Sequence, residues 1–303
     1  MANKRQVFLQ SFALTSNTKL TYEIDKRFTY HRLFLRFIDG AGADATIAQI
    51  AAQIGDVALK LGGFIERELN AVQLQSFEEH ELGLNAGSLV ANSNGYLTLN
   101  FESSDIENGE PAINPKTGAI ENAYLKEATA LGTLNFPDKI TLEVNPLTLT
   151  VAITNVEIYA EVSENTPMGF IKQHLRTLIP SVAIGLNTIQ NLTRGKILGY
   201  FIANSVLPTR GILKVDGSSI EFEGPRGLYD HASKIQGYKP VTNFFGIDFT
   251  RNKRLLDAKD VKSSNATLDL TFAATSTNVP IITKRLVKYE QTGNRAGFND
   301  FSA

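Results

Sequence analysis

The sequence contains no cysteine and no tryptophan among its 303 residues. The lack of cysteine excludes disulfide bonds and thiolate metal sites, so the fold must be held by burial, hydrogen bonds and association. An excess of either charge is also missing, because 30 Lys and Arg residues face 31 Asp and Glu residues and leave a net charge of −1. Proteins whose main task is to bind nucleic acid usually carry a basic excess, so we expect no direct sequence-specific binding of nucleic acid.

Long apolar runs are missing as well: no stretch approaches the roughly 18 residues that a membrane-spanning helix needs. The N-terminal residues include Lys4 and Arg5, but the apolar stretch that follows is interrupted by Gln10, Ser11 and Ser16. This pattern does not match a secretory signal peptide, whose apolar segment is continuous. We therefore expect a chain that folds in a reducing cytosol.

Recognisable catalytic and metal-binding motifs are missing too. The acidic segment around His80 lacks a second histidine four residues later, so it does not match the zinc-protease pattern. The segment from Asp105 to Glu110 matches a calcium loop poorly, because its glycine comes one position early and the distal glutamate is missing. We assign no catalytic residue, no cofactor and no identified metal ligand. Calcium between subunits stays an open alternative, because carboxylates that meet across an interface need no linear motif. The four histidines are interpreted as structural or surface residues: His31, His80, His174 and His231.

What the sequence does contain is a series of short alternating runs separated by turn residues, which is typical of β-sandwiches and barrels. In the run 32–38, for example, Leu33, Leu35 and Phe37 fall on one face. Predicted strands in the first half are 6–12, 19–24, 32–38, 96–101, 140–144 and 149–162, and in the second half 196–206, 211–222, 243–249, 266–272 and 280–289. A change of phase near Asn155 predicts a bulge, and Asp216-Gly217 predicts a hairpin turn.

Helical periodicity is rare and is confined to four segments. The longest, 45–61, places apolar residues at helical spacing and ends at Gly62-Gly63. Three shorter helices are predicted at 122–131, 226–235 and 254–261. Because helices and strands do not alternate regularly, a parallel doubly wound sheet is unfavourable, and the fold class is all-β with inserted helices.

The two halves share an order of elements at an offset of roughly 130 to 150 residues, a length that matches the commonest domain size. We align a strand that ends at Leu69 with one that ends at Val215, and Leu99-Asn-Phe101 with Ile247-Asp-Phe249. In both halves two further strands close the unit. This order predicts two tandem eight-stranded jelly rolls, a double jelly roll, with short inserted helices. The predicted boundaries are 1–163 for the first jelly roll, 164–180 for a linker, 181–290 for the second jelly roll and 291–303 for a C-terminal tail.

Several stretches also carry a resemblance to a known family. They are Leu131-Gly-Thr133 before the strand 139–144, Phe170-Ile-Lys-Gln173 after Thr166-Pro167, Gly199-Tyr-Phe-Ile-Ala203, and Ile247-Asp-Phe249 before 254–261. In these stretches the sequence resembles the corticovirus-type major capsid proteins, which belong to the double-jelly-roll capsid proteins of tailless icosahedral phages with an internal membrane. Finnlakevirus-like phages of Bacteroidetes hosts are a related group to which the chain is also similar.

The resemblance implies a structural protein rather than an enzyme. It implies homotrimers whose six jelly rolls form a pseudo-hexagonal capsomer, assembled in the bacterial host cytoplasm into the virion capsid. The implied partners are neighbouring capsomers, penton and minor capsid proteins, and the surface of the inner viral membrane.

Two segments are expected to carry exposed contacts. The long loop from Ser103 to Ile120 is expected, from the resemblance, to form an outward tower; a plain surface connection is the alternative. Its candidate residues are Ser103, Asp105, Glu107, Asn114 and Lys116. In the tail, Phe298 and Phe301 are candidates for contacts between subunits, with a frayed terminus as the alternative.

Two other function classes stay open on the residues alone. The first is a phage receptor-binding or spike protein, or another carbohydrate-binding β-sandwich, which the lack of tryptophan disfavours because sugars often stack on that side chain. The second is a β-sandwich hydrolase, which the missing pair of acid and base residues disfavours.

Overall fold

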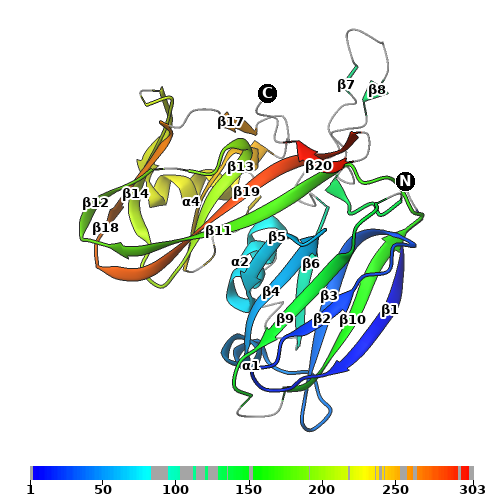
Figure 1. Ribbon diagram of the computed structural model, residues 1–303. Helices are drawn as coiled ribbons and strands as arrows, with labels where there is room; N and C mark the ends of the chain where they lie inside the picture. Colours follow the sequence, from blue (N-terminus) through cyan, green and yellow to red (C-terminus); the bar gives the residue numbers. More distant parts are fainter. Residues whose placement is uncertain are drawn as a thin grey trace. The chain divides into compact units, whose positions relative to one another are not determined.

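The computed structural model describes most of the chain as two compact units, each built from two layers of antiparallel strands (Figure 1). The described residues are 3–82, 95–102, 112–113, 120–121, 129–134, 136–149, 153–190, 192–217, 219–235, 237–238, 241, 243–252, 258–261, 265–292 and 295–299. Unit 1 comprises Met1–Glu79, Leu84–Ser104 and Lys126–Ile171, and unit 2 comprises His80–Gly83, Asp105–Leu125 and Lys172–Ala303.

In the described part of unit 1, eight strands pair in two antiparallel sets. One sheet has the order β1-β10-β3-β6, and the strands of the other pair in the order β5-β4-β9-β2. The strands are β1 (Arg5–Ala13), β2 (Leu20–Glu23), β3 (Thr29–Asp39), β4 (Ile54–Leu61), β5 (Phe64–Asn70), β6 (Tyr96–Asn100), β9 (Ile140–Pro146) and β10 (Ile153–Ser163).

Unit 2 repeats this arrangement. Its sheets have the orders β16-β13-β19-β11 and β12-β18-β14-β15. The strands are β11 (Phe170–Val182), β12 (Gly185–Ile189), β13 (Gly195–Ala203), β14 (Pro208–Val215), β15 (Ser219–Pro225), β16 (Phe244–Asp248), β18 (Thr267–Phe272) and β19 (Ser276–Thr292). Two short strands extend the first of these sheets, β17 (Lys259–Val261) beside β13 and β20 (Arg295–Asn299) beside β19.

The eight main strands of each unit follow one topology. Counted along the chain, strands one, eight, three and six form one sheet, and strands five, four, seven and two form the other. Two antiparallel sheets joined in this Greek-key order make a jelly roll. The predicted fold class, two tandem eight-stranded jelly rolls with short inserted helices, is confirmed.

The core of each unit follows from alternation along its strands. Leu33, Leu35 and Phe37 in β3 are fully buried, while the residues between them are only partly covered. In unit 2, Tyr200 and Ile202 of β13 pack in a core with residues of β14, β16 and β18. Alternate side chains point to opposite faces of a strand, so one face of each sheet builds the core and the other is left for other contacts.

The turn and bulge signals are also confirmed. The pairing of β10 with β3 shifts register between Ile153 and Asn155, where the phase change predicts a bulge. Asp216 and Gly217 connect β14 to β15 with φ of 58° and 79°. This left-handed backbone is favourable for glycine and tolerated by aspartate, which explains the Asp-Gly pair.

Of the four predicted helices, one is confirmed in full: α4 spans Arg226–Ile235. The prediction for 45–61 is wrong over its second part, because α1 (Ile47–Gln53) ends where β4 begins. The prediction for 254–261 is wrong at its end, where β17 lies after the 3-10 helix η3 (Phe249–Asn252). Residues 122–128 and 253–257 lie outside the described residues.

A longer helix, α2 (Ala71–Leu82), was not predicted. Asn70 begins it: the Asn70 side chain accepts a hydrogen bond from the Gln73 backbone N–H at 2.9 Å, and the Gln73 side chain accepts from the Asn70 N–H at 3.1 Å. This reciprocal arrangement is a capping box, and the pattern Asn-x-x-Gln is readable in the sequence. No helix in the described part of the chain is long and apolar enough to cross a membrane.

Candidate functional site

The residues proposed from the sequence lie largely outside the part of the chain that the structure describes. This holds for Ser103, Asp105, Glu107, Asn114, Lys116 and Phe301. Within the long loop the structure describes two short antiparallel strands, β7 (Ala112–Ile113) and β8 (Ile120–Glu121). Phe298 lies in β20 opposite Tyr289 of β19, so this part of the tail is paired in a sheet. Whether these residues contact neighbours stays a prediction.

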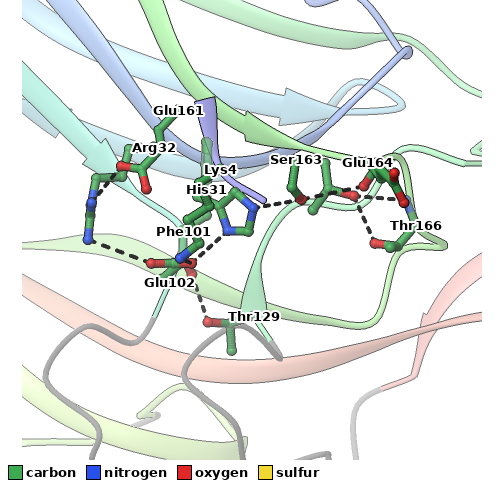
Figure 2. A network of polar contacts seen from close by, with 11 residues as sticks. Lys4, His31, Arg32, Phe101, Glu102, Thr129, Glu161, Ser163, Glu164 and Thr166 are labelled. Carbon is green, nitrogen blue, oxygen red and sulfur yellow. Dashed lines mark hydrogen bonds and ion pairs between the residues drawn. The ribbon is translucent and has the colours of Figure 1, made fainter. Parts of the chain in front are cut away.

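The structure instead brings together a network of buried polar side chains at one end of the sheet β1-β10-β3-β6 (Figure 2). Its centre is Glu102, which has no solvent exposure. Glu102 Oε1 accepts a hydrogen bond from Lys4 Nζ and lies 2.6 Å from His31 Nδ1, while Oε2 lies 3.6 Å from Arg32 Nη2. Because an ionised carboxylate only accepts, His31 Nδ1 carries the proton of that bond.

The network joins the ends of four strands. Lys4 precedes β1, His31 lies near the start of β3, Glu102 follows β6, and Ser163 ends β10. In an antiparallel sheet of this order these positions meet at the same end. The network therefore stabilises the end of the sheet at which the chain leaves β6 for residue 103 and leaves β10 for residue 164.

The segment after β10 is held by further hydrogen bonds at the same end. The Thr166 N–H donates to Thr29 Oγ1 at 2.8 Å, and the two hydroxyl groups lie 2.8 Å apart. The Asn165 side chain donates to the Lys26 carbonyl at 2.8 Å and accepts from Thr133 Oγ1 at 3.0 Å. Residues 165 and 166 are thus fixed to the connection from β2 to β3 and to Thr133, which precedes β9.

The electrostatics of Glu102 favour its ionised form. Burial by itself raises the pKa of this carboxyl, but hydrogen bonds from His31 and Lys4 outweigh it and lower the pKa from 4.5 to about 2. Taking a carboxylate out of water costs free energy, and the hydrogen bonds and ion pairs from its partners offset that cost. Removing one partner is therefore strongly destabilising, because a buried charge is then left uncompensated.

The contacts of Ser163, His31 and Glu102 have the order of an acyl-transfer triad. His31 Nε2 lies 2.8 Å from Ser163 Oγ, and its other nitrogen meets the carboxylate. However, the exposed fractions of these three residues are 5%, 1% and 0%, and Lys4 and Arg32 compensate the charge of Glu102. Because these side chains are almost completely buried, we interpret the arrangement as a structural connection between β3, β6 and β10.

A second buried ionic cluster lies in unit 2, on the face of the sheet β16-β13-β19-β11 that points away from the core. Glu81, in the last turn of α2, lies 3.4 Å from Lys172 Nζ of β11 and 2.8 Å from Lys284 Nζ of β19. Its neighbour His80 lies 3.5 Å from Asp248 at the end of β16. Burial raises the pKa of Glu81, but Lys172 and Lys284 outweigh it and leave that pKa well below its ordinary value.

Aromatic rings surround the same cluster. His80 stacks on Tyr238 with 5.0 Å between ring centroids and lies 5.9 Å from the ring of Phe201 and 5.4 Å from that of Phe244. Asp248 also accepts hydrogen bonds from the Thr250 backbone and hydroxyl. The last turn of α2 therefore covers this sheet face with both charged and aromatic contacts.

Sequence reasoning missed both clusters. Members that contact one another lie far apart along the chain, by 132 residues for His31 and Ser163 and by more for Glu81 and Lys284, so no local motif marks them. The segment around His80 fails the zinc-protease pattern, and in the structure it supplies two partners of the second cluster. Among the described residues no group of three or more His, Cys, Asp or Glu side chains is arranged to hold a metal ion.

Comparisons with known proteins give a likeness in structure but none in sequence. No protein-family model matches the chain, and no curated protein matches it significantly. The chain is similar to the major capsid protein P2 of bacteriophage PM2, with 15% identity and a TM-score of 0.70 over 96% of this chain and 99% of that chain.

Two further solved structures show the same likeness. A chain of the PBCV-1 virus capsid has 11% identity and a TM-score of 0.63, over 98% of this chain and 97% of that one. A chain from the atomic structure of Sulfolobus Turreted Icosahedral Virus has 12% identity and a TM-score of 0.63, over 93% and 90%. At such identities the likeness establishes the fold. The chain has the double-jelly-roll fold that these capsid proteins share.

Proposed function

We propose that this chain is a viral major capsid protein whose homotrimers form pseudo-hexagonal capsomers of an icosahedral shell around an internal membrane. The observation that carries the proposal is the same eight-strand topology occurring twice in one chain. Three copies then supply six jelly rolls, which is what a sixfold position in a closed shell requires. The similarity to the PM2 protein over 96% of the chain supports this interpretation.

The composition agrees with such a role. A chain without cysteine folds in a reducing cytoplasm, which fits assembly inside a bacterial host. A net charge of −1 does not favour direct binding of the genome, which fits a shell separated from it by a membrane. Neighbouring capsomers, penton and minor capsid proteins, and the inner membrane surface are the partners that we propose.

The mass of the purified chain in solution, measured by light scattering together with negative-stain imaging, tests the proposal. We expect a species of three times the 33.2 kDa chain mass with a hexagonal outline. A single-chain species at every concentration, with specific binding on a glycan array, would contradict it and favour a receptor-binding protein.

A further inference from the structure

The two jelly rolls can be compared position by position on the sheet face that points away from the core. In unit 2, Asp248 and Lys284 both lie opposite Gly199 of β13. In unit 1, Asn100 and Glu161 both lie opposite Arg32 of β3. Since Leu99-Asn-Phe101 and Ile247-Asp-Phe249 end the sixth strand in each unit, the two rows are equivalent positions of the repeat.

Aromatic residues occupy equivalent positions on both faces. Phe201 comes two residues after Gly199, as Phe34 comes two residues after Arg32. Phe244 lies opposite Ala203, and Tyr96 lies opposite Arg36, each four residues further along the third strand. The repeat has thus kept an aromatic pair on the outer face of the same sheet in both units.

The two faces differ in how they are covered. In unit 2 the last turn of α2 lies over the face, and Phe201 and Phe244 are 0% and 4% exposed. In unit 1 Tyr96 is 37% exposed, and Phe8, whose ring packs on Tyr159 at 5.4 Å, is 56% exposed. The outer face of unit 1 therefore combines exposed aromatic side chains with the ion pairs Arg32–Glu161 and Arg36–Glu157, and no element of the described chain covers Tyr96 as α2 covers Phe244.

Helix α4 is the repeat counterpart of α2. Each helix directly follows the fifth strand of a jelly roll, and His80 and Ile235 are both the tenth residue of their helix. On α4 the exposed residues Leu228, His231 and Ile235 lie on one helical face at spacings of three and four, and the exposed fractions of Leu228 and Ile235 are 52% and 69%. One helix face and one sheet face of the repeat are therefore left open.

We propose that α4 of one copy docks on the outer face of the sheet β1-β10-β3-β6 of a second copy, over Phe34 and Tyr96, as the last turn of α2 covers Phe201 and Phe244. In this proposal the contact between α4 and the sheet face joins neighbouring copies of the chain. The proposal rests on the proposed function.

The charges agree with this pairing. Glu81 of α2 meets Lys284, whereas the position of Lys284 is taken in unit 1 by the acidic Glu161, which pairs with Arg32 at 2.6 Å, and the last turn of α4 carries Lys234. A contact between two different faces, repeated head to tail, closes into a ring where the rotation between copies is a simple fraction of a turn, as a trimer requires, and otherwise gives an open filament.

Disulfide trapping tests the contact, because the chain has no cysteine of its own. The variant carrying Ile235→Cys and Tyr96→Cys is oxidised mildly and run on a denaturing gel without reductant. We expect bands at two and three times the chain mass that disappear with reductant. The matched pair Ile235→Cys with Ile184→Cys, in which residue 184 is 68% exposed between β11 and β12, is expected to stay at the single-chain mass.

A second measurement separates this inference from the proposed function. If the wild-type chain is an oligomer in light scattering but the Ile235–Tyr96 cysteine pair gives only single-chain bands, the docking contact is wrong and the capsid proposal stands. A single-chain wild type without cross-links overturns both. Leu228→Asp with Ile235→Asp should convert the oligomer to single chains that keep the circular dichroism spectrum of the folded protein, whereas Ile184→Asp should leave the oligomer intact; equal masses for the two variants would overturn the contact.

Discussion

At the scale of single residues, the buried carboxylate of Glu102 is the most sensitive point of the first jelly roll. It meets Lys4, His31 and Arg32 without access to water. We expect Glu102→Gln to lower the free energy of unfolding by about 2 to 4 kcal/mol, because the buried amide carries no charge to compensate Lys4 and leaves Arg32 with Glu161 as its counterion.

Urea unfolding measures this effect, and Glu143→Gln is the matched control. Glu143 also accepts from two lysines, Lys19 at 3.1 Å and Lys60 at 2.9 Å, but its side chain keeps 15% exposure to water, against none for Glu102, so its replacement should cost less than about 1 kcal/mol. An equal decrease in the free energy of unfolding for the two variants would show that burial does not determine how much the Glu102 contacts stabilise the fold.

The same carboxyl makes stability depend on pH. Its pKa is about 2 in the folded chain against an ordinary 4.5, so the folded state binds this proton less readily than the unfolded state. The contribution is therefore complete above pH 4.5 and is lost as the pH falls toward 2. We expect the difference in unfolding free energy between wild type and Glu102→Gln to shrink between neutral pH and a pH of about 3; a constant difference would contradict the lowered pKa.

At the scale of elements, the start of α2 depends on the capping box of Asn70 and Gln73. We expect Asn70→Ala to lower the free energy of unfolding by about 1 kcal/mol, because a backbone N–H at the helix start loses its acceptor. Gln75→Ala removes only a side-chain contact with Glu79 in the same helix and should cost a few tenths of a kcal/mol. Thermal unfolding followed by circular dichroism compares the two, and no difference between them would mean that the cap is dispensable.

The wrong helix prediction for 45–61 has a physical reason in β4. Between Ile54 and Val57 its pairing with β9 shifts register, so three steps on β4 face two on β9. A bulge of this kind changes the alternation of buried residues and places Ile54, Val57, Ala58 and Leu61 inside at helical spacing. Periodicity alone cannot distinguish this bulged strand from a helix. At α4 the helical spacing of apolar residues does come from a helix, so the same reasoning gave the right prediction.

The alignment of the two halves that the sequence predicts is right at the sixth, seventh and eighth strands, which occupy equivalent places in the two units. At the earlier pairing the alignment is wrong: Leu69 lies in the fifth strand of unit 1, β5, and Val215 ends the fourth strand of unit 2, β14. The counterpart of the turn Asp216-Gly217 is Gly62-Gly63, where all φ values are likewise positive. The two turns between the fourth and fifth strands are therefore recognised as equivalent by their shared backbone conformation and not by a match of apolar residues.

At the scale of the whole molecule, the order of elements shared by the two halves sufficed to predict the double jelly roll, because alternation and turn chemistry are local signals. The strand count did not follow in full, since six and five predicted strands stand against eight main strands in each unit. The polar clusters were out of reach, since His31, Glu102 and Ser163 meet only after the Greek-key connections are made. The open faces were also out of reach: an apolar residue on a strand or helix looks the same in sequence whether it is buried within one copy, as Phe201 is, or exposed, as Ile235 is.

The kind of force that joins the copies leads to a prediction for the assembled molecule. The proposed contact places Leu228 and Ile235 on aromatic side chains, and burial of apolar surface is not screened by salt, whereas contacts between exposed charges are. We expect the oligomer mass in light scattering to stay the same when sodium chloride is raised from about 0.1 M to about 1 M. If the oligomer instead dissociates at high salt, the copies are held by surface ion pairs, and α4 with its apolar stripe is not the element that joins them.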